Sequence, residues 1–407
     1  MQSKYLGIKA SLFINYFVFA ILLNSVGIVM LKAQKVYGID KVDVSILELF
    51  KDLPIAIVSF LVASFLPKIG YKKGMLAALA LVSLACLGMY LGDSFLASKF
   101  LFAAVGAAFA IIKVSVYASI GLVTANQSEH NSLLSNIEGF FMFGIAFSSF
   151  LFPFFNSGVD PSAWLNVYLF LFGLCLLSFI FLLFANFESQ EITKDDLEEQ
   201  DFGKMFQLMV KPLVIVFSIS AFLFVMMEQG IMTWLPTFND NVLKIPENMA
   251  IMMGAILTVS IGVGRFLAGF LVKFISWFWI LIFCIAMSIL IILFVLPAAV
   301  NAEVETIATL SDIPIMGFIF PLIGLFLGPI YPLISSTVLS AYPKKFHAHI
   351  AGLIIIFSAL GGTLGSRIIG YIFEHVDAKF AFSYAIIPMA LLIIAVYFLN
   401  RLTKNVK

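Results

Sequence analysis

The sequence predicts an all-α membrane protein with twelve transmembrane helices, arranged as two six-helix bundles. Composition is the first indication, because 62% of the 407 residues are hydrophobic and only 12% are charged, against about 25% charged in soluble domains. Apolar runs recur at the length of roughly 20 residues that a bilayer core requires. A charged stretch from Glu188 to Lys204 divides these runs into two sets of six.

The expected spans are continuous apolar runs, whereas transmembrane β-strands would alternate apolar and polar residues. Pro321, Pro329 and Pro332 predict kinks within the tenth span. We therefore expect an N-terminal bundle over 1–187, a cytoplasmic linker over 188–208 and a C-terminal bundle over 209–407. The twelve spans are 8–31, 44–66, 72–91, 97–124, 132–155, 163–185, 209–236, 248–273, 276–297, 314–341, 349–373 and 379–400.

The distribution of Lys and Arg predicts the orientation. With both termini inside, fourteen of these residues fall in inner segments and six in outer loops. Cytoplasmic segments of membrane proteins carry this excess of positive charge. The sequence thus predicts a multi-pass protein of the inner (plasma) membrane with both termini cytoplasmic.

Several function classes are disfavoured by what the sequence lacks. A net charge of +1 provides no basic field for nucleic acid. The sequence contains no HExxH motif, nucleophile elbow or P-loop, so neither an enzyme nor an ATP-driven pump is expected. No pore loop or ring of repeated charge indicates a channel. Cys86, Cys175 and Cys284 lie in apolar runs without metal-binding spacing and are expected to pack as small hydrophobic residues.

Short motifs carry a resemblance to a known family. Basic, glycine-bearing segments occur at matching positions of the two halves, at 67–74 and 264–273. With the six-plus-six plan, they resemble the major facilitator superfamily. A finer similarity, to the fucose–proton symporter family, rests on Leu23-Asn24, Asn136-Ile137, Gly264-Arg265-Phe266 and Tyr331-Pro332.

The resemblance implies the major facilitator fold, alternating access and a solute site near the midplane between the halves. It also assigns solute-binding roles to Asn24, Asn136 and Tyr331. Two positions depart from the family pattern: Ser25 stands where the family has Asp, and Lys113 where it has Glu. Because those carboxylates bind proton and sugar in the family, the resemblance leaves the solute and the coupling open.

Ionisable residues within spans are functional candidates, since placing them in a bilayer is costly. Lys113 lies near the middle of span four, with Tyr117 one turn away on the same face. Lys113 either faces the solute cavity or belongs to a structural ion pair. Glu138 in span five is either permanently paired with Lys113 or Arg265, or is a carboxylate that carries the coupling proton.

Span seven carries a second polar group. Glu228 is the other candidate proton carrier, and Gln229 and Trp234 are typical of a site that hydrogen-bonds and stacks a polar ring. For Trp234, an interfacial aromatic belt is the alternative interpretation.

A gate is predicted where span two opens. Glu48 and Asp52 share one helix face, and the family fold would bring their helix beside Arg367 in span eleven. A carboxylate–guanidinium bond there would close the outer side, with Arg265 of span eight completing the gating set. Alternatively, Arg367 binds an anionic solute directly.

The resulting functional hypothesis is a secondary active transporter that moves a sugar, sugar acid or related organic anion by proton symport. Export by proton antiport is the alternative. The expected partners are a small-molecule solute, protons and the lipid bilayer, with no nucleic acid, cofactor or metal, and the protein is expected to be a monomer. His347 and His349 are more typical of a solvated loop than of a metal site.

Overall fold

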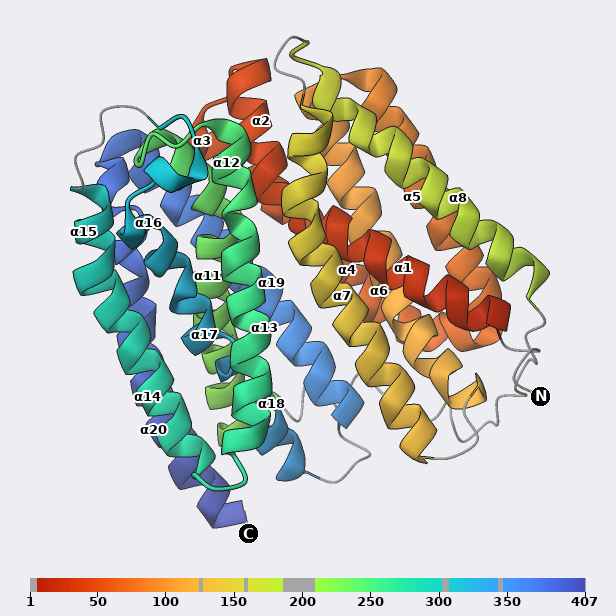
Figure 1. Ribbon diagram of the computed structural model, residues 1–407. Coiled ribbons are helices and arrows are strands. Elements are labelled where there is room, and N and C mark those ends of the chain that lie inside the picture. Colours follow the sequence, from red (N-terminus) through yellow and green to blue (C-terminus); the bar gives the residue numbers. More distant parts are fainter. Residues whose placement is uncertain are drawn as a thin grey trace. The chain divides into compact units, whose positions relative to one another are not determined.

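The computed structural model describes residues 6–123, 127–156, 160–185, 209–301, 307–342 and 347–406 (Figure 1). Over these ranges the chain forms helices and connecting turns, without a strand. This follows from the apolar runs, because a helix satisfies its backbone hydrogen bonds within one segment and needs no water. The predicted linker over 188–208 lies outside the described residues.

The N-terminal part of the chain contains long helices joined by short connections. The first apolar run is divided at Ser25 into two helices, and Lys41–Val44 forms one further turn. The elements are α1 (Leu6–Asn24), α2 (Val26–Tyr37), α3 (Lys41–Val44), α4 (Ile46–Ile69), α5 (Tyr71–Gly92), α6 (Phe95–Val123), α7 (Gln127–Phe155), η2 (Ala163–Leu165) and α8 (Asn166–Phe184).

The C-terminal part is more interrupted. The predicted kinks of span ten are confirmed, because this run is divided into four short helices near its prolines. The elements are α11 (Pro212–Asn241), α12 (Glu247–Met252), α13 (Gly254–Leu271), α14 (Trp277–Leu290), the π-helical turn η3 (Ile291–Val295), α15 (Leu296–Val300), η4 (Leu310–Asp312), α16 (Ile315–Ile319), η5 (Phe320–Ile323), α17 (Gly324–Leu327), α18 (Ile330–Ser340), α19 (His347–His375), η7 (Ala378–Phe380), η8 (Ser383–Ala385) and α20 (Ile386–Val406).

Ten helical stretches of the described chain are long and apolar enough to cross a bilayer. Two further long helices, α4 and α7, are not among these ten: Glu48, Lys51 and Asp52 lie near the start of α4, and the described residues of α7 include an apolar stretch over Phe140–Phe155. The multi-span prediction is therefore confirmed, while the number of twelve spans stays a prediction. Phe266, Phe154 and Phe184, which are 84%, 81% and 79% exposed, suit a hydrocarbon surface better than water.

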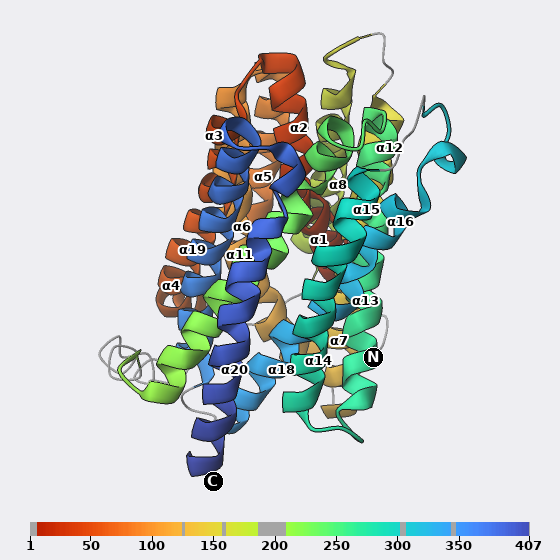
Figure 2. The ribbon, with the colours of Figure 1, turned by 90° about the vertical axis from the view of Figure 1, so that its left-hand side faces the viewer.

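The described helices pack as two compact units. The first comprises Met1–Val29 and Leu47–Gln200, and the second comprises Met30–Ile46 and Asp201–Lys407. The end of α2 and all of α3 therefore pack with the C-terminal helices, although a division of the sequence at 187 assigns them to the N-terminal bundle. Figure 2 shows α3 beside the end of α19. We refer to residues Met30–Ile46 as the 30–46 segment.

Buried hydrogen bonds join helices within the first unit. The hydroxyls of Ser11 in α1 and Ser178 in α8 lie 3.1 Å apart, and Ser178 donates to the Asn15 side chain at 3.0 Å. The Lys72 ammonium donates to the carbonyls of Leu183 and Ala185, which the end of α8 leaves without an intrahelical partner. These bonds fix α1 and α5 against α8. They are directional, whereas apolar contacts alone would not set the rotation of one helix relative to another.

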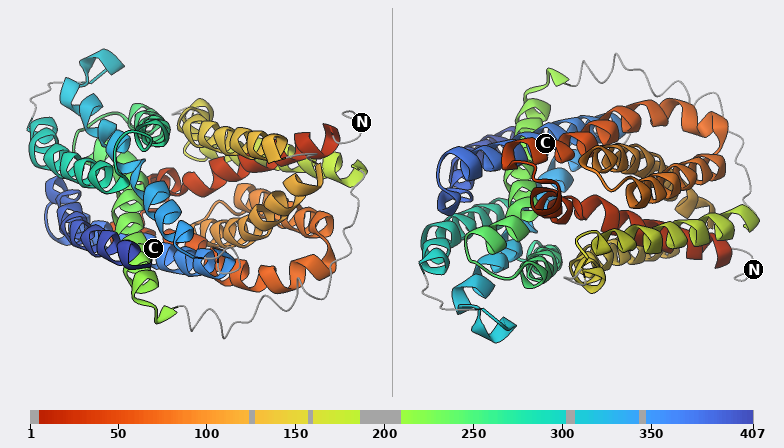
Figure 3. Two further views of the ribbon diagram at one scale, coloured as in Figure 1. Left: turned by 90° about the horizontal axis from the view of Figure 1, so that it is seen from below. Right: turned by 90° about the horizontal axis from the view of Figure 1, so that it is seen from above.

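In the second unit, α11 packs along α19 and α20, as the end-on views of Figure 3 show. Gly361 and Gly365 of α19 face the backbone carbonyls of Phe222 and Met226 in α11, so closely that any side chain would collide with backbone. Small residues at this spacing let two helix backbones approach closely, and Gly361 and Gly365 have that role in this contact. This contact fixes the position of Glu228 and Gln229 on α11 relative to α19.

We predict that Gly365→Leu destabilises the protein, because its Cβ would overlap the backbone of Met226, which cannot rotate away as a side chain can. Overpacking of this kind costs about 1–3 kcal/mol or more. Thermal unfolding in detergent should show a clearly lowered Tm. Gly269→Leu is the matched control, because no atom lies within 4 Å of the Cβ position there. Equal melting of both variants would contradict the packing argument.

Candidate functional site

A polar cluster lies inside the second unit, where four helices supply one side chain each. Glu228 of α11 and Arg265 of α13 form an ion pair with 3.7 Å between Oε1 and a guanidinium nitrogen. The hydroxyl of Tyr331 in α18 interacts electrostatically with the Glu228 carboxylate and the Arg265 guanidinium. It lies beside Ser358 of α19. The Tyr331 ring packs on Phe224, one turn before Glu228, with 6.0 Å between ring centroids. We call Glu228, Arg265, Tyr331 and Ser358 the polar cluster.

The ion pair of the polar cluster is loose and uneven. The side chain of Glu228 is 14% exposed and that of Arg265 is 39% exposed, so the carboxylate is far more enclosed than its partner. A separation of 3.7 Å is longer than the roughly 2.7–2.9 Å typical of a strong charge-assisted hydrogen bond. The guanidinium therefore compensates the charge of Glu228 without saturating its oxygens.

Three polar atoms in this region lack a hydrogen-bond partner among the described residues. They are Oε1 of Glu228 and the hydroxyls of Ser335 and Ser358, all buried. Ser335 lies one turn after Tyr331 in α18 and so shares its face. Buried polar groups without partners are rare in native proteins and call for an explanation, of which a functional role is one.

Gln229 and Trp234, the other predicted residues of span seven, are positioned by α19. The Gln229 side-chain amide lies against Gly362, within 2.5 Å of where a Cβ would stand. Trp234 is fully buried, stacks on Phe373 at 5.2 Å, and donates from its indole nitrogen to Ser366 at 2.9 Å. The Trp234 ring is thus used for packing α11 against α19, and neither an interfacial belt nor solute stacking accounts for it in this structure.

The predicted residues of the first unit lie on separate helices. Asn24 ends α1, and its side chain donates to the Ala20 carbonyl at 2.9 Å. Lys113 of α6 is half-buried, with its ammonium 5.8 Å from the ring centre of Phe109. The side chains of Tyr117, Asn136 and Glu138 lie outside what the structure describes, as do those of His347 and His349.

The predicted gating carboxylates have a partner on their own helix. The Lys51 ammonium lies 2.6 Å from Glu48 and 3.6 Å from Asp52, and all three side chains are buried. Because i and i+3 positions of a helix are neighbours, these charges are compensated locally. Lys51 is therefore an additional member of this group, beside the two carboxylates predicted from the sequence.

Arg367 differs from the prediction in the same way. Its guanidinium donates to the Val42 carbonyl and, at 3.4 Å, to the Ser45 hydroxyl. Both oxygens are uncharged and belong to the 30–46 segment rather than to the carboxylates of α4 that the gating hypothesis named. Arg265, predicted to belong to the gate, lies in the polar cluster beside Glu228. Arg367 lies in a helix, as predicted, in α19. Its partners Val42 and Ser45 lie at the short helix α3, whose position the sequence does not determine.

Sequence reasoning missed a second set of ion pairs. Lys32 and Lys35 in α2 pair with Glu247 at the start of α12, Lys35 at 3.2 Å. Lys35 also lies 2.5 Å from Asp240 at the end of α11. The i, i+3 spacing of the two lysines was a usable signal, but their partners lie more than 200 residues away in the sequence.

Comparison with solved structures shows the same architecture in membrane transporters. The chain superimposes on the nucleoside transporter NupG with a TM-score of 0.74, at 14% identity, over 96% of this chain and 99% of that one. The E.coli Fucose:proton symporter FucP gives 0.63, at 14% identity, over 97% and 99%. A bacterial homolog of the human lysosomal transporter Spinster gives 0.71, at 14% identity, over 100% and 98%.

At this identity the structural likeness concerns the fold, and no curated protein matches the sequence. The model of one family, however, matches residues 12–366, which is most of the chain. The resemblance seen in the short motifs is thereby confirmed at the level of the superfamily, and the protein belongs to the Major Facilitator Superfamily.

Proposed function

We propose that the protein is a secondary active transporter that carries a small polar solute by alternating access and couples it to protons in symport. The polar cluster carries this proposal, because it combines a carboxylate, a guanidinium and hydroxyls with three unpartnered buried atoms inside apolar helices. Such groups persist in membrane helices mainly where a solute or ion pathway requires them. A sugar, sugar acid or related organic anion is the solute class we favour.

The chemistry of the polar cluster suits a hydroxylated solute. Oε1 of Glu228 accepts hydrogen bonds, the Ser335 and Ser358 hydroxyls donate and accept, and Arg265 donates to a hydroxyl or carboxylate. A solute hydroxyl group would complete bonds that the described residues leave open. The structural neighbours named above include a nucleoside transporter and a fucose–proton symporter, whose solutes both carry several hydroxyl groups.

Coupling follows from the loose ion pair. Protonation of Glu228 removes its charge, which releases Arg265 to bind the solute, and deprotonation draws Arg265 back. Glu138 remains the second candidate proton carrier from the sequence. In export by antiport, the alternative cycle, the same competition runs with proton and solute moving in opposite directions.

We predict that Glu228→Gln abolishes accumulation driven by an inward proton gradient, while solute counterflow survives. Gln keeps the shape and an acceptor oxygen but cannot exchange a proton. Uptake and counterflow of a labelled solute in proteoliposomes measure the two activities separately. Asp160→Asn, an exposed acid bonded locally to the Ser162 N–H, is the control and should retain both. Gradient-driven accumulation in Glu228→Gln would exclude this residue as the proton carrier, and absence of counterflow in the wild type would exclude a carrier altogether.

Lys113 of the first unit is a further solute-binding candidate from the sequence, and a substitution tests it by itself. If its ammonium contacts the solute, Lys113→Ala should weaken solute binding about tenfold or more, since a hydrogen bond to a charged group contributes about 1.5–3 kcal/mol. Ligand-induced thermal stabilisation measures the affinity. If Lys113 instead belongs to a structural pair with Glu138, the single variant loses stability and Lys113→Met with Glu138→Gln regains it. Unchanged affinity in a folded Lys113→Ala protein would contradict the solute contact.

We further propose that the 30–46 segment is the part of the chain that must detach from the C-terminal helices when its side of the protein opens. Its charged contacts with the C-terminal helices include the Lys32–Glu247, Lys35–Glu247 and Lys35–Asp240 pairs and the bond from Arg367 to the Val42 carbonyl. The pairs of Lys35, whose side chain is 37% exposed, can break at modest cost. Lys32 is buried, so opening its pair with Glu247 costs more and needs a compensating interaction in the open state. This assignment keeps the predicted gating role of Arg367 and replaces its partner.

We predict that Glu247→Ala, like Arg367→Ala, increases the accessibility of this end of the protein. Thr237 is fully buried and accepts a bond from Gln34 of the 30–46 segment at 3.4 Å, so Thr237→Cys is a suitable reporter. Labelling by a membrane-impermeant thiol reagent should become several-fold faster in both variants, and faster in high salt, which screens exposed charges. Asp377→Asn, an exposed acid bonded locally to the backbone of Lys379, should leave the rate unchanged. Equal rates in all variants would contradict this gate.

A further inference from the structure

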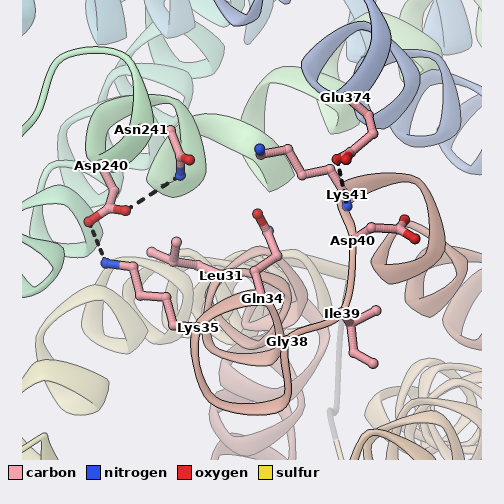
Figure 4. Close-up of a pocket in the computed structure, with 10 residues that line it drawn as sticks. All are labelled: Leu31, Gln34, Lys35, Gly38, Ile39, Asp40, Lys41, Asp240, Asn241 and Glu374. Carbon is pink, nitrogen blue, oxygen red and sulfur yellow. Dashed lines mark hydrogen bonds and ion pairs between the residues drawn. The ribbon is translucent and has the colours of Figure 1, made fainter.

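A pocket of about 340 Å³ lies within the second unit, at the ends of α2, α11 and α19 (Figure 4). It is separate from the polar cluster, and no residue of that cluster lines it. The lining comes mainly from the 30–46 segment, with Asp240 and Asn241 from α11 and Glu374 from α19. Its volume falls within the range of about 300–1,000 Å³ that is typical of small-molecule sites. We call it the end pocket.

The walls of the end pocket are held by their own polar contacts. Lys35 lies 2.5 Å from Asp240, and Asn241 donates to the same carboxylate at 3.4 Å. On the opposite wall, the backbone N–H of Lys41 donates to Glu374 at 3.3 Å. Since these contacts join groups of the wall to each other, the shape of the pocket is set before any ligand arrives.

Other polar groups of the end pocket remain available. The Lys41 side chain is half-buried, and its ammonium has no hydrogen-bond or ion-pair partner in the described part of the chain. Gln34 uses its amide nitrogen on the Met30 carbonyl and Thr237, which leaves its oxygen free to accept. Figure 4 shows the Lys41 side chain reaching across the pocket toward Asn241, and the Gln34 side chain pointing into the space between Lys35 and Lys41.

The charges of the lining nearly cancel. Lys35 and Lys41 stand against Asp40, Asp240 and Glu374, and Asp40 is already used to cap α3 through the Asp43 N–H at 2.6 Å. A ligand with a single strong charge, of either sign, would therefore be repelled by lining residues that carry the same sign. The lining offers both hydrogen-bond donors and hydrogen-bond acceptors. A ligand rich in hydroxyl groups suits such a lining, because each hydroxyl can both donate and accept.

We propose that the end pocket is a second binding site, for a small uncharged polyhydroxylated molecule. The choice of ligand class rests on the proposed function, because a solute of this class would reach both the end pocket and the polar cluster. Bound there, the ligand bridges the 30–46 segment to α11 and α19 and stabilises that arrangement by RT ln(1 + [L]/Kd).

The test uses the full-length protein in nanodiscs, with one cysteine added in each of two reporter variants. Ile39→Cys, the pocket reporter, probes the end pocket, and Ser358→Cys, the cluster reporter, probes the polar cluster, while Cys86, Cys175 and Cys284 are buried. The probes are D-xylose, L-fucose, uridine and, as a charged comparison, D-glucuronate, and the readout is the rate of maleimide labelling. At a probe concentration of about ten times its Kd, labelling of the pocket reporter should fall about tenfold.

Two sets of further substitutions, each made in the pocket-reporter variant, show which site the ligand occupies when it slows labelling. Lys41→Met and Gln34→Leu, which remove the free ammonium and the free acceptor, should each abolish its protection, whereas Lys379→Met, an exposed lysine outside the lining, should not. Tyr331→Ala impairs the polar cluster and should leave protection of the pocket reporter intact. If Tyr331→Ala removes it, the pocket reporter merely responds to the other site and the proposal is overturned.

The two proposals fail in different ways. Protection of the cluster reporter alone overturns the end pocket as a site and leaves the transport proposal standing. Protection of the pocket reporter alone supports the end pocket. Because Ser358→Cys itself removes a hydroxyl of the polar cluster, the solute site there is contradicted only if Tyr331→Ala also leaves solute counterflow unchanged. Protection by D-glucuronate in preference to the uncharged probes contradicts the ligand class proposed here, and protection of neither reporter overturns both sites for these solutes.

Discussion

Compensation of charge inside apolar helices is the constraint on which the polar structure of this protein depends. A charged side chain placed in a bilayer is costly, and a partner in the same apolar surroundings reduces that cost. In the first unit Lys51 lies between Glu48 and Asp52 on a single helix. In the second, Glu228 finds Arg265 on a neighbouring helix. The two pairs differ in separation, at 2.6 Å and 3.7 Å, and the longer separation is the reason for proposing Glu228 rather than the carboxylates of α4 as the proton carrier.

The close packing of α11 against α19 places the looser pair. Gly361 and Gly365 bring the two backbones together, and Trp234 extends the contact through its bond to Ser366. With α19 fixed in this way, Gln229 lies at Gly362 and Ser358 lies one turn earlier on the same face. The polar atoms of the proposed solute site are thus held by rigid backbone contacts, which is the arrangement that a binding site needs for defined geometry.

The 30–46 segment, proposed above as a gate, is held by contacts of a different kind. It follows α1 and precedes α4 in the chain, yet its side chains and backbone bond to α11, α12 and α19. Its contacts are ion pairs and single hydrogen bonds, in contrast to the glycine-to-backbone contacts between α11 and α19. The exposed pairs of Lys35 are weak individually and sensitive to salt, whereas the pair of the buried Lys32 with Glu247 is more costly to open. All of these contacts can be made and broken without unfolding a helix. The end pocket lies within these same contacts, so a ligand bound there would act on the segment proposed as the gate.

The sequence by itself determined the class of protein, the helices and much of their interruption. Three features of the sequence have local consequences: the apolar runs, the prolines of span ten and the glycines of span eleven. Backbone hydrogen bonding is satisfied within a helical turn, and a missing side chain acts only where another helix touches it. It also identified Glu228, Arg265 and Tyr331, because a charge or a motif in an apolar run stands out. Only the tertiary structure decided which residues meet. Arg367 bonds to Val42 instead of a carboxylate, Trp234 is buried against Phe373, and Lys35 meets Asp240. Spacing along a helix gives the face a residue shares with its neighbours, but it contains no information on which other helix, or which turn between helices, that face will contact.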